Sequence, residues 1–156
     1  MAEVIKVTGQ DAYVQVFEST RGLKVGSVAE FTDHMLEIQM GPGMLSKNYD
    51  GLQNDLDKME GVFLKRGQYT EPLDADREWD FVPIVQVGDR VQESDWLGEV
   101  EENHQPLKIM VPFQMKGFAT VKSIVPAGKY RIHDVVAVLE DEKGEEIKVD
   151  MVQHCL

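Results

Sequence analysis

The chain has 156 residues, of which 42% are hydrophobic and 28% are charged, a composition typical of a folded globular protein. Sixteen Lys and Arg against 28 Asp and Glu give a net charge of −12, which argues against nucleic-acid binding because a phosphate backbone would be repelled. The single cysteine, Cys155, excludes an internal disulfide and a multi-cysteine zinc site, and the longest apolar run, residues 135–139, is too short to span a bilayer.

Apolar and polar residues alternate with a period of two over most of the chain. This pattern predicts half-buried strands near residues 5–7, 13–17, 36–40 and 147–151. Glycine-containing turns separate the predicted strands, at residues 8–11, 21–22 and 143–144. We therefore expect a mainly β protein.

One stretch follows helical spacing instead. It predicts an amphipathic helix, continuous or broken, that ends at Gly61. Gly51 lies inside it and costs about 1 kcal/mol relative to alanine, which weakens the case for a continuous helix. The apolar positions of this helix are Leu45, Tyr49, Leu52, Leu56 and Met59.

A boundary is expected near residues 65–78, where Gly67, Pro72 and the charged run 74–78 are typical of a linker. From residue 82 onward the pattern again predicts short strands, and these strands contain a weak internal repeat. Val87-Gly88-Asp89 followed by Asp95 resembles Ala127-Gly128-Lys129 followed by Asp134. Two such units predict a pseudo-symmetric β sandwich or barrel, and a chance similarity between two hairpins is the alternative.

The segment 41–48 follows a predicted strand and resembles a phosphate-binding P-loop. Such a loop needs G-x-x-x-x-G-K-[ST], because the second glycine lets backbone amides close on phosphate and the hydroxyl binds magnesium. Ser46 replaces that glycine and Asn48 replaces the hydroxyl residue. A structural turn is therefore the favoured interpretation.

No other motif in the sequence indicates a catalytic or metal-binding site. The spacing of the histidines does not bring zinc ligands together locally, and the acidic residues 140–146 flank a Lys-Gly turn as a solvated hairpin tip would. Cys155 lies next to the end of the chain and is not expected to act as a nucleophile, while Trp79 and Phe81 are expected in a core or an interface. We predict no catalytic, cofactor-binding or metal-binding residue. The histidines considered are His34, His104, His133 and His154.

The repeat in the second half resembles biotinyl and lipoyl carrier domains. The resemblance implies a barrel-sandwich-hybrid-like β domain, joined here to partial N-terminal barrel strands and one short helix. Carrier function requires a lysine at the tip of the central hairpin. The corresponding tip, about residues 103–106, has none, and Lys108 and Lys116 lie outside it.

Read end to end, the chain resembles the catalytic A subunit of V-type and archaeal-type rotary ATPases. Residues 13–26 resemble the pattern Q-V-Y-E-x-T-x-G-L-x-x-G of the end barrel. Residues 40–53 resemble L-G-P-G-L-L followed by D-G-I-Q-R-P-L, with Asn54-Asp55-Leu56 in place of Arg-Pro-Leu. Two later blocks resemble the inserted bulge, or non-homologous region, which the regulatory B subunit lacks. They comprise Phe63, Arg66, Gly67, residues 79–81 and 88–89, and then residues 109–112, Gly117 and residues 128–130.

The resemblance implies three parts: partial barrel strands and a connecting helix in residues 1–65, a bulge domain in 66–145, and a connector in 146–156. It also implies that barrel strands precede Glu3 and that a nucleotide-binding domain, which would hold ATP and magnesium, follows Gln153. Residues 82–140 would lie on the outside of a cytoplasmic ATPase head, with the B subunit and the peripheral stalk as partners. The N-terminus shows no secretory signal, which agrees with that location.

The parent complex of such a subunit couples ATP hydrolysis or synthesis to proton or sodium transport, and this region would be non-catalytic. An unclosed barrel would expose strand edges, which favours pairing between copies. Two other functions stay open: a stand-alone carrier or β-domain binding module, and a small ATP-binding enzyme that uses the 41–48 loop.

Overall fold

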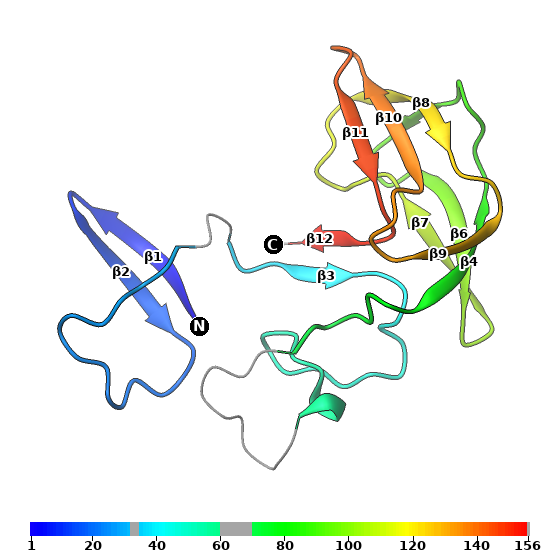
Figure 1. Ribbon diagram of the computed structural model, residues 1–156. Coiled ribbons are helices and arrows are strands. Elements are labelled where there is room, and N and C mark those ends of the chain that lie inside the picture. Colours follow the sequence, from blue (N-terminus) through cyan, green and yellow to red (C-terminus); the bar gives the residue numbers. More distant parts are fainter. Residues whose placement is uncertain (32–34, 60–69, 156) are drawn as a thin grey trace.

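The computed structural model describes residues 1–31, 35–59 and 70–155, and it is mainly β, as predicted (Figure 1). The first three strands and a single turn of 3-10 helix precede a β sandwich, and a last short strand follows it. The elements are β1 (Ala2–Thr8), β2 (Asp11–Val16), β3 (Ile38–Met40), the 3-10 turn η1 (Leu56–Lys58), β4 (Glu78–Pro83), β5 (Arg90–Gln92), β6 (Trp96–Glu102), β7 (Gln105–Met110), β8 (Phe118–Ile124), β9 (Gly128–Arg131), β10 (Ala137–Asp141), β11 (Glu146–Val149) and β12 (Gln153–Cys155).

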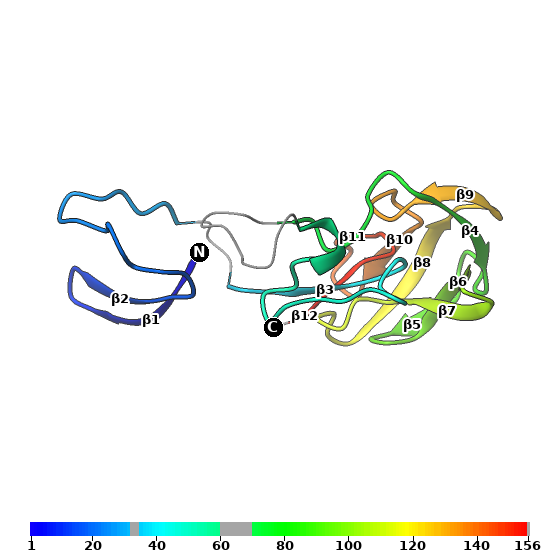
Figure 2. The ribbon, with the colours of Figure 1, turned by 90° about the horizontal axis from the view of Figure 1, so that it is seen from below.

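Strands β1 and β2 form an antiparallel hairpin that stands apart from the sandwich in both ribbon views (Figures 1 and 2). Gly9 has a positive φ of 62° in the turn, a conformation that glycine adopts without a Cβ penalty. The alternating pattern that predicted these two strands is confirmed. However, the apolar side chains of both strands are largely exposed: Ile5, Val7, Tyr13 and Val14.

The amphipathic helix predicted for residues 45–59 is wrong, because this stretch forms turns and only the short η1. The Asp50 carboxylate accepts hydrogen bonds from the backbone N–H groups of Leu52 and Asn54 at 2.9 and 2.8 Å. Gln53 has a φ of 60°, which no right-handed helix can contain. These local side-chain bonds replace the helical ladder. Gly61, the predicted helix end, lies outside the described residues, and no helix within them is long and apolar enough to cross a membrane.

The sandwich consists of two four-stranded sheets with the orders β7-β6-β4-β9 and β11-β10-β8-β5. The two sheets correspond strand by strand: β7, β6, β4 and β9 of the first sheet have the same places as β11, β10, β8 and β5 of the second. The internal repeat is therefore confirmed, and a pseudo-twofold axis relates its two copies. We call β4–β7 the first repeat and β8–β11 the second repeat. Each repeat contributes one strand to the sheet that the other repeat otherwise forms: β5 of the first repeat pairs with β8, and β9 of the second repeat pairs with β4.

The two connections to the sandwich lie side by side. Strand β3, before the sandwich, pairs antiparallel with β12, after it, with Met40 opposite Gln153. Both strands run together in Figure 1. Part of the boundary predicted near residues 65–78 lies outside the described residues, as do Phe63, Arg66 and Gly67 of the family resemblance, so the domain limits stay a prediction.

Candidate functional site

The loop that resembles a P-loop is anchored by a carboxylate of the sandwich. Glu102, at the end of β6, has only 3% of its surface exposed. Its Oε1 accepts hydrogen bonds from the backbone N–H groups of Gly43 and Leu45 at 3.0 and 3.2 Å. A P-loop would aim such amides at phosphate. Here an internal carboxylate occupies them, which supports the interpretation of this loop as a structural turn.

The glycines of this loop allow its close approach to the sandwich. A Cβ on Gly41 would lie 3.1 Å from the carbonyl oxygen of Met151 and 3.3 Å from Leu73 Cδ1. Gly43 has a φ of 104°, which side-chain-bearing residues rarely adopt. Both glycines therefore serve packing between the loop and the residues that enter and leave the sandwich.

A buried ion pair follows the loop, at the position where the family pattern has Arg-Pro-Leu. The Asp55 side chain is fully buried, and its Oδ2 lies 2.5 Å from Lys47 Nζ and 3.8 Å from Lys58 Nζ. Burial pushes the pKa of Asp55 up, but the hydrogen bonds from Lys47 and the Asp57 amide, together with the charges of Lys47 and Lys58, outweigh burial and hold the pKa below its ordinary value. The hydrogen bond to Asp55 raises the pKa of Lys47. This pair stabilises residues 47–58 and leaves neither group free for acid–base chemistry.

The histidines within the described residues do not form a cluster. His104 lies 3.3 Å from Glu101, His133 lies 3.4 Å from Asp150, and His154 lies 3.0 Å from Glu37, while His34 falls outside the described residues. Within residues 1–31, 35–59 and 70–155, no three His, Cys, Asp or Glu side chains form a group that could hold a metal ion.

The hairpin between β6 and β7 turns at Asn103 and His104, which have φ values of 50° and 63°. Lys108 lies on β7 and pairs with Glu99, and Lys116 lies in the turn before β8, so neither reaches this tip. The other residues singled out by sequence are structural. Trp79 and Phe81 are core residues, as predicted, and Cys155 lies on β12 opposite Ile38.

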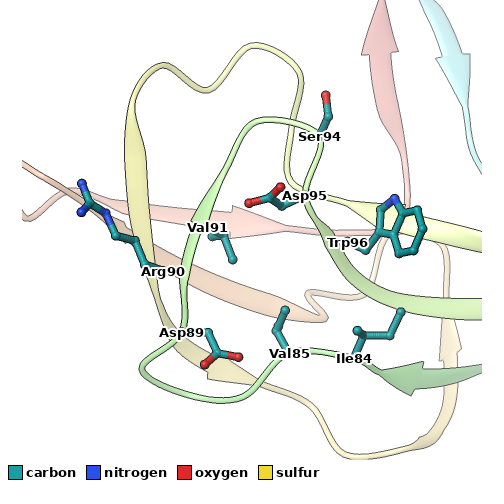
Figure 3. A pocket seen from close by; sticks show the side chains of 8 residues that line it. All are labelled: Ile84, Val85, Asp89, Arg90, Val91, Ser94, Asp95 and Trp96. Atoms are coloured by element: carbon teal, nitrogen blue, oxygen red, sulfur yellow. The ribbon is translucent and has the colours of Figure 1, made fainter.

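An open hollow of about 460 Å³ lies beside the turn that joins β4 to β5 (Figure 3). Its apolar lining comes from Ile84, Val85, Val91 and Trp96. Trp96 is 55% exposed, which is unusual for a residue of its size. The sequence analysis did not single out this tryptophan. The repeat offered a signal, because Val135, a smaller residue, stands at the position that matches Trp96.

The fold defines a class: an eight-stranded barrel-sandwich domain preceded by a β hairpin. Residues 70–155 match the family model of the ATP synthase alpha/beta subunit barrel-sandwich domain, and residues 1–33 match that of the ATP synthase alpha/beta family β-barrel domain. The chain belongs to the ATP synthase alpha/beta family, as the sequence resemblance predicted.

Individual relatives agree with this assignment. The V-type ATP synthase alpha chain 1 of Treponema pallidum is 46% identical over 153 residues, which are 96% of this chain and 26% of that protein. The V-type ATP synthase alpha chain of Treponema denticola is 42% identical over 153 residues, with the same coverage. That of Borrelia garinii subsp. bavariensis is 42% identical over 156 residues, which are 98% of this chain and 27% of that protein. The chain thus spans about a quarter of the length of these relatives.

Proposed function

We propose that these 156 residues are a non-catalytic structural and interaction region of the alpha chain, or catalytic A subunit, of a V-type ATP synthase. The observation that carries the proposal is identity of 42–46% along 96–98% of the chain to V-type ATP synthase alpha chains. The parent complex would couple ATP hydrolysis or synthesis to proton or sodium transport. ATP and magnesium would bind the parent subunit outside this region.

The anchored loop supports an architectural role. The amides of Gly43 and Leu45 are bonded to a buried carboxylate of the sandwich, so nucleotide phosphate would have to displace Glu102 to reach them. The Asp55–Lys47 pair and the β3–β12 pairing add further bonds around the entry to the sandwich. These contacts favour a fixed orientation of the sandwich relative to the segments that connect it to the rest of a subunit.

The proposed partners are the B subunit and the peripheral stalk of a cytoplasmic ATPase head. The net charge of −12 favours reversible contacts with basic protein surfaces over contacts with nucleic acid. In this arrangement the sandwich would face outward as the bulge domain, and the β1–β2 hairpin would be completed by further barrel strands. The exposed apolar side chains of that hairpin are consistent with such completion.

The second candidate, a stand-alone β-domain module, is favoured by the sandwich fold alone. As a carrier it would need a modified lysine, whereas the β6–β7 tip consists of Asn103 and His104. Intact-mass measurement of the protein from its native source distinguishes the two. A biotinyl or lipoyl mass increment would contradict the architectural proposal, and an unmodified mass is the expected result.

A chimera tests the proposal directly. The 153 matched residues of the Treponema denticola alpha chain are replaced by the corresponding residues of this chain. We expect the chimera to assemble with its partner subunits and to retain magnesium-dependent ATPase activity. A chimera that folds and binds nucleotide but does not assemble would contradict the proposal. Sequencing the source gene through both ends of the chain should also reveal an in-frame G-x-x-x-x-G-K-[ST] downstream.

A further inference from the structure

The pseudo-twofold provides an internal template for the hollow beside Trp96. Val91 of β5 pairs with Ala119 of β8. Tyr130 of β9 pairs with Trp79 of β4 at the equivalent positions. The β5–β8 pair therefore has two small side chains where the equivalent β9–β4 pair has two large ones.

Tyr130 fills its corner of the sandwich. Its ring lies edge-on to Phe81 with the centroids 6.2 Å apart, and its hydroxyl donates to the Pro126 carbonyl at 3.1 Å. A Cβ on Gly128 would lie 3.4 Å from the tyrosine ring. Val91, the residue of β5 at the place of Tyr130, has no ring to fill the corresponding corner and lines the hollow instead. The hollow therefore occupies the place that an aromatic ring fills in the second repeat.

The walls of the hollow suit an aromatic guest. Ile84 is 47% exposed and Trp96 is 55% exposed, and the Lys108 ammonium lies 5.0 Å from the centre of the indole ring. An aromatic side chain placed between them would bury apolar surface and contact the indole, and such ring contacts add about 0.5–1.5 kcal/mol beyond burial.

The rim of the hollow is acidic. The carboxylates of Asp89 and Asp95 line it, and each accepts one backbone hydrogen bond through Oδ2, at 2.8 Å. Arg90 points away from the hollow (Figure 3): its guanidinium stacks 4.0 Å from the Phe118 ring and lies 3.3 Å from Glu142. Negative charge thus faces the opening, and the nearest arginine is engaged elsewhere.

We propose that this hollow is a docking site for a protein segment that carries an aromatic side chain next to lysine or arginine. The ring takes the place that Tyr130 takes in the second repeat, and the basic residue faces Asp89 and Asp95. A second copy of the chain is a poor occupant, because each copy carries a net charge of −12. The inference concerns the sandwich alone and does not depend on which complex contains the chain.

The experiment is a nuclear magnetic resonance titration of the ¹⁵N-labelled 156-residue chain. The probe is the peptide acetyl-Lys-Gly-Tyr-Gly-Lys-amide, and two matched peptides replace tyrosine by serine or lysine by glutamate. We expect shifts centred on the Trp96 indole and the amides of Ile84 and Val91 with the first peptide. We expect binding at least about threefold weaker with either matched peptide at low salt. Equal binding of the three peptides, or shifts centred elsewhere, would overturn the proposal.

Variants identify the site. Val91→Tyr should fill the hollow as Tyr130 does and abolish the shifts, and Trp96→Ala should weaken binding without touching the buried core. Val135→Ala, the matched control in the second repeat, should leave binding unchanged. Unaltered binding to a folded Trp96→Ala variant would contradict the proposal, as would a chain that dimerises through the hollow in light scattering.

Discussion

In the first repeat Phe81 packs against Gly98, and in the second repeat Val121 and Ala137 take the equivalent positions. Phe81 pairs with Val100 as Val121 pairs with Leu139, and the register then shifts between Leu139 and Val138 in the second repeat only. A large residue beside a glycine has been exchanged for a medium residue beside an alanine. The comparison shows that one backbone plan accepts different side chains when a gain of volume on one strand is balanced on its neighbour.

The acidic residues at the ends of β6 and β10, which have equivalent places in the two repeats, also make different contacts. Asp141, at the end of β10, accepts hydrogen bonds from Lys143 and Glu145 of its own hairpin, each at 2.8 Å. Glu102, at the end of β6, accepts from Gly43 and Leu45, far away along the chain. A local turn interaction in one repeat corresponds to a long-range anchor in the other.

The largest effect is expected from Gly98→Ala. The new Cβ would lie 2.3 Å from two ring atoms of Phe81, which is fully buried and cannot move aside. We expect a loss of about 3 kcal/mol in the free energy of unfolding, measured by urea denaturation. The double variant Phe81→Val with Gly98→Ala copies the second repeat and should recover at least about 1 kcal/mol of that loss. Strictly additive effects would show that the two positions do not compensate each other.

Glu102→Ala should follow, with a loss of about 2 kcal/mol, because two backbone N–H groups lose a charged acceptor. Asp141→Ala should cost about 1 kcal/mol, because its turn lies at a more exposed hairpin tip. Amide hydrogen exchange should accelerate at Gly43 and Leu45 in the first variant only. If both variants destabilise equally and exchange at Gly43 is unchanged, the long-range anchor is not an important contact.

Tyr130→Val gives the second repeat the smaller residue of the first. The loss of the edge-on contact with Phe81 and of the bond to Pro126 should cost about 1.5 kcal/mol. Thermal denaturation measures the change, and Tyr130→Phe, which keeps the ring, should cost less than half as much. A larger loss for Tyr130→Phe than predicted would assign the stabilisation to the hydroxyl and not to the ring.

The smallest effect lies outside both repeats, in the segment held by Asp55. Its pKa is lowered in the folded protein, so its contribution is complete above the unfolded value of about 4 and is lost as the pH falls below it. The pKa of Lys47 is raised in the folded protein, so its contribution to stability is complete at lower pH and is lost as the pH rises above about 10.4.

The Asp57 amide donates to Asp55 Oδ1, so its chemical shift should report the acid transition. Asp55→Asn should abolish that transition, and Asp74→Asn, a matched change at an exposed carboxylate, should leave it in place. An acid transition that persists in Asp55→Asn would assign it to another group.

Local sequence determined the parts of this fold that depend on short-range chemistry. Alternating apolar residues predicted the strands near residues 5–7 and 147–151, because successive side chains of a strand point to opposite faces. The paired glycines and aspartates predicted the repeat, and the aspartates form similar turns in both halves: Asp95 accepts from Gln92, and Asp134 accepts from Arg131. The apolar spacing in residues 45–59 failed as a helix signal because Asp50 bonds its own neighbours.

The rest was decided only by tertiary structure. No local pattern states that β5 and β9 exchange between the sheets, because strand order depends on contacts between distant segments. Glu102 is one of many acidic residues in the sequence, and only the fold brings it against Gly43; the exposed position of the Trp96 side chain is likewise defined only by the fold. Sequence alone determined the family and the strand plan. The three-dimensional packing determined which amides are occupied and which corner of the sandwich stays open, because both depend on the volumes of side chains that meet only after folding.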